Sequence, residues 1–182
     1  MVALASAAAP PHPPGPDSCF ACMGASDPLA CHRVAVTLAA RQDYDRAIAI
    51  EEQVRDLRPR NPEVASALAR MYYAGHQDAA RAIALYHEAL HDVSGYPPAL
   101  LGLGTIMDER GEVEIASRYY ARAARENPDV AVFKVRLADT LMRSGREAEA
   151  RPLLSEIVDR WPGSQEADAA RKLMAHTALA KP

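Results

Sequence analysis

Residues 100–128 read LLGLGTIMDERGEVEIASRYYARAARENP, and this stretch decides the fold class. Its apolar residues recur at helical steps of three and four, which places Leu100, Leu103 and Met107 on one face. Gly111 interrupts the pattern, and a second helical stretch continues until a proline ends it. The stretch therefore predicts two helices joined by a tight turn.

The same hairpin pattern recurs along the chain. Small residues follow one another at intervals of 35, 34 and 34, at Ala47, Ala82, Ala116 and Ala150. A second series has the same period and consists of Ala35, Ala69, Gly104 and Ala138. One inserted residue, expected in the turn formed by residues 75–78, accounts for the 35-residue step in both series. Because small side chains let helices cross closely, the two series predict a stack of helical hairpins that bury their apolar faces against one another.

Helix caps and prolines divide the chain into segments. Asp27 and Asn61 each precede a proline, which suits the first turn of a helix, and Ser164 can cap a last helix. The second helices are expected to end before Pro59, Pro128 and Pro162. The predicted segments are a proline-rich region at 1–27, hairpins at 28–61, 62–96, 97–130 and 131–163, and a polar-faced capping helix with its tail at 164–182.

The hairpins resemble the tetratricopeptide repeat. In the third hairpin, the family's bulky, small, turn and stop positions are matched by Leu100, Leu103, Gly104, Met107, Gly111, Ala116, Tyr120, Ala123 and Pro128. The first hairpin departs from the pattern at Glu51, where an aromatic residue is usual. We expect this position to be open to solvent, or the first hairpin to pack loosely. Pentatricopeptide arrays have a 35-residue period and bind RNA, but the stop prolines and the near-neutral charge favour the tetratricopeptide interpretation.

The resemblance covers residues 28–162. It implies an all-α, right-handed superhelical array of about four helix-turn-helix hairpins plus a C-terminal capping helix. It also implies a concave face lined by the first helix of each hairpin. An array of this kind is expected to act as a non-catalytic scaffold or adaptor that binds a protein or peptide partner, without a cofactor.

Composition narrows the range of partners and locations. The formal net charge is −3 and no basic stripe is present, which argues against nucleic-acid binding. No apolar stretch is long enough for membrane insertion. Residues 1–9 are apolar but lack a basic start, so a cytoplasmic location is favoured; a truncated signal peptide would instead place the protein in the periplasm or outside the cell.

The peptide-binding residues are expected on the side of the first helices opposite their core contacts. They are His32, Val36, Ser66, Arg70, Tyr73, Leu101, Thr105, Asp108, Val135, Asp139 and Met142. This set suits a peptide with an apolar core and mixed flanking charge. The lysine and asparagine clamp of chaperone-binding family members is not visible, which disfavours binding of chaperone tails.

Two chemical alternatives remain open. Cys19, Cys22 and Cys31 could form a metal-binding or redox module, although Cys31 occupies a core position of the first helix. The stretch from His87 to His91 matches the H-E-x-x-H motif of zinc hydrolases, with Glu88 as the base. The repeat register places both histidines on a surface, and no third ligand follows, so no metal site is predicted. The exposed end of the array could also support homo-oligomerisation.

Overall fold

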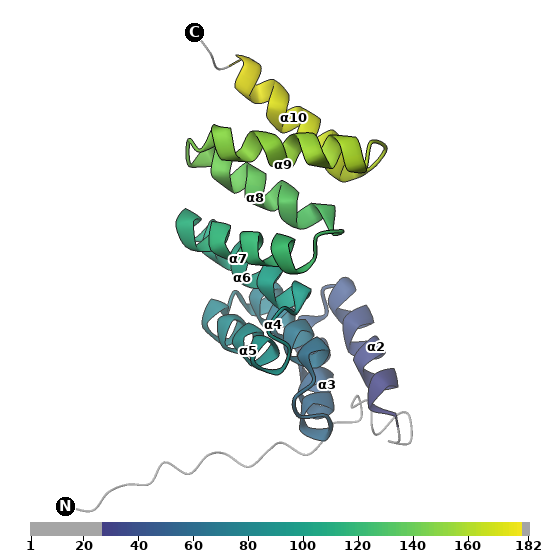
Figure 1. Ribbon diagram of the computed structural model, residues 1–182. Coiled ribbons are helices and arrows are strands. Elements are labelled where there is room, and N and C mark those ends of the chain that lie inside the picture. Colours follow the sequence, from purple (N-terminus) through teal and green to yellow (C-terminus); the bar gives the residue numbers. More distant parts are fainter. Residues whose placement is uncertain (1–26, 180–182) are drawn as a thin grey trace, which may run out of the picture. The chain divides into compact units, whose positions relative to one another are not determined.

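The computed structural model describes residues 27–179, and these form nine α-helices without a β-strand (Figure 1). The helices are α2 (Pro28–Ala40), α3 (Tyr44–Leu57), α4 (Pro62–His76), α5 (Ala79–Asp92), α6 (Pro97–Glu109), α7 (Val113–Glu126), α8 (Ala131–Arg143), α9 (Glu147–Arg160) and α10 (Gln165–Leu179). The predicted all-α array of helical hairpins is confirmed. Within residues 27–179, no helix is both long and apolar enough to cross a membrane.

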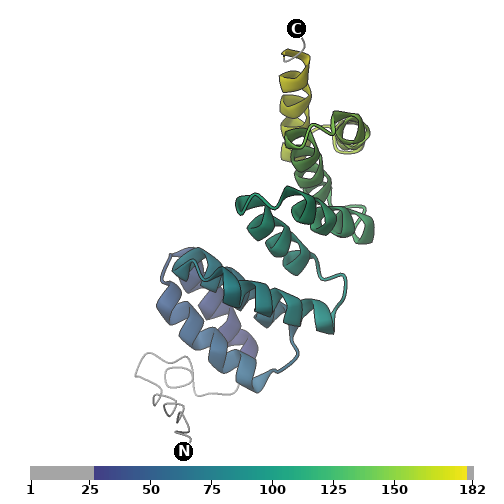
Figure 2. The ribbon, with the colours of Figure 1, turned by 90° about the vertical axis from the view of Figure 1, so that its left-hand side faces the viewer.

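The chain divides after Pro59 into two compact units. In the first unit, α2 packs against α3. In the second unit, each helix from α4 to α10 contacts the next one along the chain, as Figures 1 and 2 show from two directions. Contacts also join the first helices α4 and α6, and the first helix α8 to the capping helix α10.

Three helices begin with side-chain caps at the residues that the sequence predicts. The Asp27 carboxylate accepts a hydrogen bond from the Leu29 amide at 2.9 Å, at the start of α2. The Asn61 side chain accepts from the amide of Glu63 at 3.0 Å and caps α4. The Ser164 hydroxyl accepts from the backbone amide three residues later at 3.1 Å and caps α10. These bonds satisfy amides that have no partner within the helix.

All four hairpin turns contain a left-handed residue at the same register position, five residues before the small alanine of the second helix. The residue is Gln42, Gln77, Gly111 or Gly145, with φ of 65°, 54°, 75° and 75°. This backbone conformation favours glycine, which occurs in two of the four turns. The position in the repeat therefore determines the backbone conformation, even where the residue at that position is not glycine.

The inserted residue lies in the last turn of α4 and not in the turn after it. The third hairpin closes with a bond from the Glu112 amide to the carbonyl oxygen of Met107, five residues earlier, at 2.8 Å. In the second hairpin, the Asp78 amide instead reaches six residues back to the Tyr72 oxygen, at 3.1 Å. The helix end is widened by one residue, so Gly75 and the residue after it remain helical. The expected place in the turn was therefore wrong.

The small residues of both series are buried. Ala47, Ala82, Ala116 and Ala150 are each 0 % exposed. Gly104, from the second series, packs under the ring of Tyr120, where a Cβ would lie 2.5 Å from Cε1. This close approach explains why the register requires small residues at these positions.

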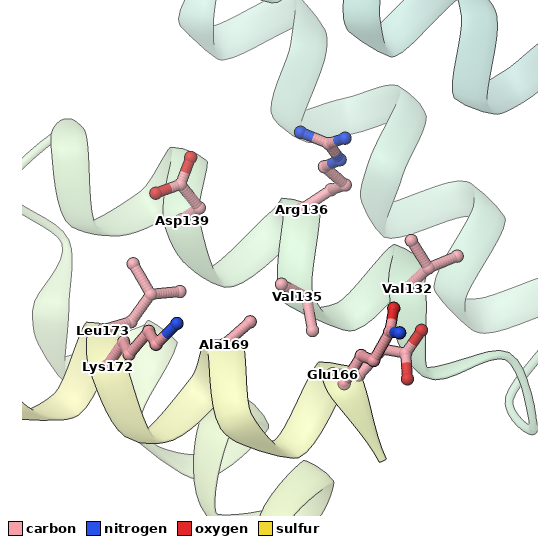
Figure 3. Close-up of a pocket in the computed structure, with 9 residues that line it drawn as sticks. Val132, Val135, Arg136, Asp139, Glu166, Ala169, Lys172 and Leu173 are labelled. Carbon is pink, nitrogen blue, oxygen red and sulfur yellow. The ribbon is translucent and has the colours of Figure 1, made fainter.

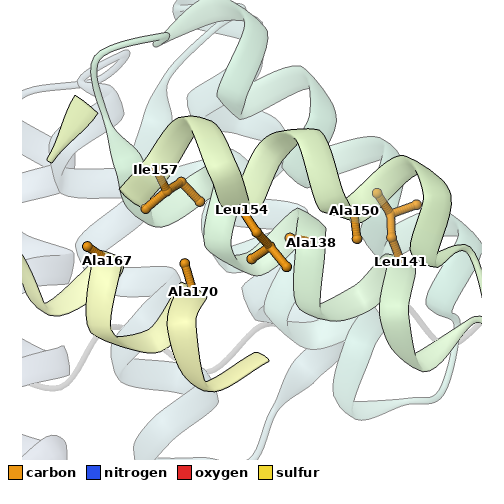
Figure 4. Packing of buried hydrophobic residues seen from close by; sticks show 7 residues of the cluster. All are labelled: Ala138, Leu141, Ala150, Leu154, Ile157, Ala167 and Ala170. Atoms are coloured by element: carbon orange, nitrogen blue, oxygen red, sulfur yellow. The ribbon is translucent and has the colours of Figure 1, made fainter. Parts of the chain in front are cut away.

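The last three helices of the second unit share an apolar core. Leu154 and Ile157 of α9 lie among the small residues Ala138 of α8 and Ala167 and Ala170 of α10, as Figure 4 shows. The alanines bring α10 close to α9, and their burial contributes the hydrophobic free energy that holds it there. The capping helix is thus packed into the array.

The first hairpin contains a buried polar pair. Glu51 of α3 is 0 % exposed, and its Oε1 lies 2.7 Å from Nδ1 of His32 on α2, within hydrogen-bonding distance. The expectation that Glu51 is open to solvent was therefore wrong. A carboxylate is tolerated at this core position because the imidazole of the facing helix supplies a polar partner.

Candidate functional site

Polar bonds connect the first helices of the second unit along one side. Tyr73 of α4 donates its hydroxyl to the Glu109 carboxylate of α6. Arg143 of α8 pairs with Asp108 of α6, and its Nε also lies 3.3 Å from Asp139 Oδ2. The helix α6 is therefore bonded to both of its first-helix neighbours.

We call this side the first-helix face and define it by Arg70, Tyr73, Leu101, Asp108 and Val135. Arg70 lies one helical turn before Tyr73, and Leu101 lies two turns before Asp108, so each pair shares one side of its helix. Apart from the exposed Arg70, these residues are half-buried. The face combines apolar contact area with polar groups that are already oriented by neighbouring helices.

The hydrogen bond between α4 and α6 also favours the neutral form of the Tyr73 phenol. Hydrogen bonding to the Glu109 carboxylate, followed by burial, raises the pKa of Tyr73 from 10.0 to about 12. A carboxylate acceptor favours the neutral phenol, because ionisation would place two negative charges together. Tyr73 is therefore a hydrogen-bond donor throughout the neutral pH range.

A pocket of about 450 Å³ lies between α8 and α10, at the end of the first-helix face (Figure 3). Its apolar part is formed by Val132, Val135, Ala169 and Leu173. Its polar part is formed by Arg136, Asp139, Gln165, Glu166 and Lys172. The pocket combines an apolar surface with charged side chains, the arrangement that binds peptide side chains in an oriented way.

The structure distributes the sequence-predicted residues over both units and over different depths. His32 and Val36 belong to the first unit, where His32 is 9 % exposed and paired with Glu51, and Val36 is half-buried. Ser66, in the second unit, is 5 % exposed. His32 and Ser66 therefore offer little surface to a ligand.

The other predicted residues lie in the second unit with at least part of their side chains at the surface. They are Arg70, Tyr73, Leu101, Thr105, Asp108, Val135, Asp139 and Met142. Arg143 brings Asp108 and Asp139 together, and Val135 and Asp139 both line the pocket. Met142 packs against the core shared by α8, α9 and α10.

The sequence interpretation missed the contribution of α10 to this face. It treated the helix as a polar-faced cap, yet Ala169 and Leu173 line the pocket. Leu173 also packs against the core that contains Ala167 and Ala170, so the apolar side of α10 extends from that core to the pocket. The signal in the sequence was that Ala169 and Leu173, four residues apart, widen the apolar side of α10 beyond the two buried alanines.

The H-E-x-x-H stretch lies on α5. His87, Glu88 and His91 are all exposed, and the Nδ1 of His91 lies 3.5 Å from Asp92 Oδ1. Within the described residues 27–179, no group of three or more His, Cys, Asp or Glu side chains is placed to hold a metal ion.

The cysteines were the other chemical candidate. Cys31 is 2 % exposed, as expected for a core position of the first helix, and it is disulfide-bonded. Cys19 and Cys22 lie outside the described residues. A sulfur in a disulfide is not a thiolate, so Cys31 in this state is not a metal ligand.

Comparison with known proteins gives a consistent result. Residues 101–165 match the family model described as tetratricopeptide repeat. No curated protein matches the sequence. Among solved structures, the chain is similar to TTC0263, a thermophilic TPR protein of Thermus thermophilus, with 19 % identity, a TM-score of 0.68, and coverage of 82 % of this chain and 81 % of that one.

Two further solved structures show the same fold. One is MamA from Desulfovibrio magneticus RS-1, residues 41 to the end, with 17 % identity, a TM-score of 0.66, and coverage of 80 % of this chain and 82 % of that one. The other is the first TPR of Spaghetti (RPAP3) bound to the HSP90 peptide SRMEEVD. It has 19 % identity and a TM-score of 0.59, and the match covers 65 % of this chain and 93 % of that one.

Proposed function

We propose that this chain, which belongs to the tetratricopeptide repeat family, is a non-catalytic scaffold that binds a segment of a partner protein along its first-helix face. The main support is that polar interactions link successive first helices: a hydrogen bond joins Tyr73 to Glu109, and an ion pair joins Arg143 to Asp108. Because these interactions already fix the side chains, binding a partner costs little further conformational entropy.

The residues of the face fit a peptide ligand. Leu101 and Val135 offer half-buried apolar surface, while Arg70 offers an exposed positive charge. One structural neighbour, the first TPR of Spaghetti, is bound to an HSP90 peptide. That peptide is not the expected partner of this chain, because the asparagines of a chaperone-tail clamp are absent from the predicted binding residues.

Affinity capture with the full chain, followed by quantitative mass spectrometry of the captured proteins, tests this proposal. Tyr73→Ala and Arg70→Glu should each reduce capture of the specific partner, by about tenfold where the residue is a central contact. Ile115→Asp provides the matched control, since Ile115 is an exposed apolar residue of the second helix α7. Undiminished capture by both variants, or loss only with Ile115→Asp, would place the site elsewhere.

The disulfide bond at Cys31 bears on the location of the protein. Disulfides persist mainly in oxidising compartments and are rare in the cytosol. Of the two expected locations, this bond favours the exported one. Thiol labelling of protein taken from acid-quenched cells should leave Cys31 unlabelled unless the sample is first reduced; ready labelling without reduction would favour the cytoplasm.

A further inference from the structure

The α10 side of the pocket between α8 and α10 carries opposite charges at its two ends. Glu166 lies in the first turn of α10, and Lys172 follows six residues later, which corresponds to about 9 Å along the helix axis. Figure 3 shows Ala169 between these two side chains along α10. Within residues 27–179, neither Glu166 nor Lys172 forms an ion pair. Both charges are therefore available to a ligand.

The opposite wall of the pocket, formed by α8, carries one charge of each sign, Arg136 and Asp139. Asp139 lies 3.3 Å from the Nε of Arg143, but Arg143 also pairs with Asp108, so its one positive charge is shared by two carboxylates. Arg136, on the same helix, forms no ion pair with the described residues and lines the pocket as an exposed side chain. Figure 3 shows Asp139 on the side of Lys172 and Leu173, and Arg136 farther along α8 beside Val135, so the order of charges along the pocket comes from Glu166 and Lys172 on α10.

Between the charges lies an apolar surface. Val132 and Val135 contribute it from α8, and Ala169 and Leu173 contribute it from α10. All four side chains are half-buried, so an aliphatic side chain placed on them would lose much of its contact with water. The pocket volume of about 450 Å³ leaves room for such a side chain together with its backbone.

The rise along α10 between Glu166 and Lys172 gives the approximate spacing of their partners in a bound segment. An extended peptide advances about 3.3 Å per residue, so about three residues cover the 9 Å between Glu166 and Lys172. A partner with a basic group near Glu166 therefore places an acidic group near Lys172 about three positions along its chain. The aliphatic residue lies between them, over Ala169.

We propose that this pocket binds an extended segment of a partner protein in which a bulky aliphatic residue lies between a basic and an acidic residue about three positions apart. The inference rests on the proposed function and adds the chemistry of the bound segment. It also makes α10 a recognition element in addition to a cap. The charges fix the direction in which the segment lies in the pocket.

A displayed library of random short peptides, selected on the full-length chain, tests the proposal. Selected sequences should contain the aliphatic residue with the paired charges. Fluorescence polarisation should then show about tenfold weaker binding to Ala169→Glu, which places a charge on the apolar surface. The double variant Glu166→Lys and Lys172→Glu should prefer peptides with the two charges exchanged, by about fivefold. Circular dichroism checks that each variant keeps its helices.

Arg171→Glu is the matched control, because Arg171 neighbours Lys172 on α10 but does not line the pocket. Its affinity for the peptides should stay near that of the wild type. Selected peptides without the charge pair, or peptides that respond to Leu101→Asp but not to Ala169→Glu, would overturn the inference and leave the proposed function standing. A library that gives no binder to the wild type would contradict both.

Discussion

The left-handed residue of each hairpin turn predicts opposite stability effects for two substitutions, one that removes glycine and one that introduces it. Gly111 has a φ of 75° and Gln77 has a φ of 54° at equivalent places in their hairpins. We expect Gly111→Ala to destabilise the second unit and Gln77→Gly to stabilise it. The reason is that a side chain at positive φ brings Cβ too close to a backbone carbonyl oxygen, and glycine has no Cβ.

At Gly111 the free-energy cost comes from the backbone conformation alone, because an added Cβ would not collide with a packed neighbour. Apart from the glycine itself and its two neighbours in the chain, no atom lies within 4 Å of the place where a Cβ at Gly111 or Gly163 would be. The left-handed conformation costs about 1 to 2 kcal/mol for a residue with a Cβ, and the lower entropy of the unfolded chain returns about 0.4 to 1 kcal/mol to alanine. The net effect is a loss of about 1 kcal/mol for Gly111→Ala and a gain of similar size for Gln77→Gly.

Urea unfolding followed by far-UV circular dichroism measures these changes. Gly163→Ala serves as the control, since Gly163 has equal space around it but no positive φ. It should leave the free energy of unfolding unchanged or raise it slightly. Equal effects of Gly111→Ala and Gly163→Ala, or destabilisation by Gln77→Gly, would refute the assignment of the turn position.

Three further substitutions test the packing and the polar pairs. Ala116→Leu should overpack a helix crossing and lower the free energy of unfolding by about 1 to 3 kcal/mol, whereas Ala84→Leu, at an exposed position of α5, should change the melting temperature little. His32→Ala should cost about 1 to 3 kcal/mol in urea unfolding, because it removes a polar partner of the buried Glu51. Tyr73→Phe should remove one ionisation near pH 12 from the ultraviolet titration. The folded pKa of Tyr73 lies above its usual value of 10.0, so its bond contributes fully below pH 10 and is lost as the pH rises through about 12. A tyrosine titration without a component near pH 12 would contradict that bond.

The period of the small residues was readable from the sequence because it reflects burial. Ala82 and Ala116 are each 0 % exposed, and a larger side chain at such a crossing is excluded by packing. The turns were readable only where glycine marks them. Gln77 has the same left-handed backbone, but no glycine marks it in the sequence. The inserted residue was therefore predicted in the turn, although the structure has it in the last turn of α4.

The polar pair and the pocket needed the three-dimensional arrangement. Glu51 is buried because His32, 19 residues earlier in the sequence, faces it across the hairpin. No local pattern marks such a pair. The pocket formed by α10 depends on α8 lying beside it, although the stripe of Ala169 and Leu173 was visible in the sequence.

Site-specific photo-cross-linking of the full chain tests most directly whether partners bind the first-helix face. A photoreactive residue at Leu101, on α6, should form a cross-link with the partner segment, while the same residue at Ile115, exposed on α7, should not. Mass spectrometry of the cross-linked peptides would identify both chains at the contact. A cross-link at Ile115 together with none at Leu101 would contradict the account.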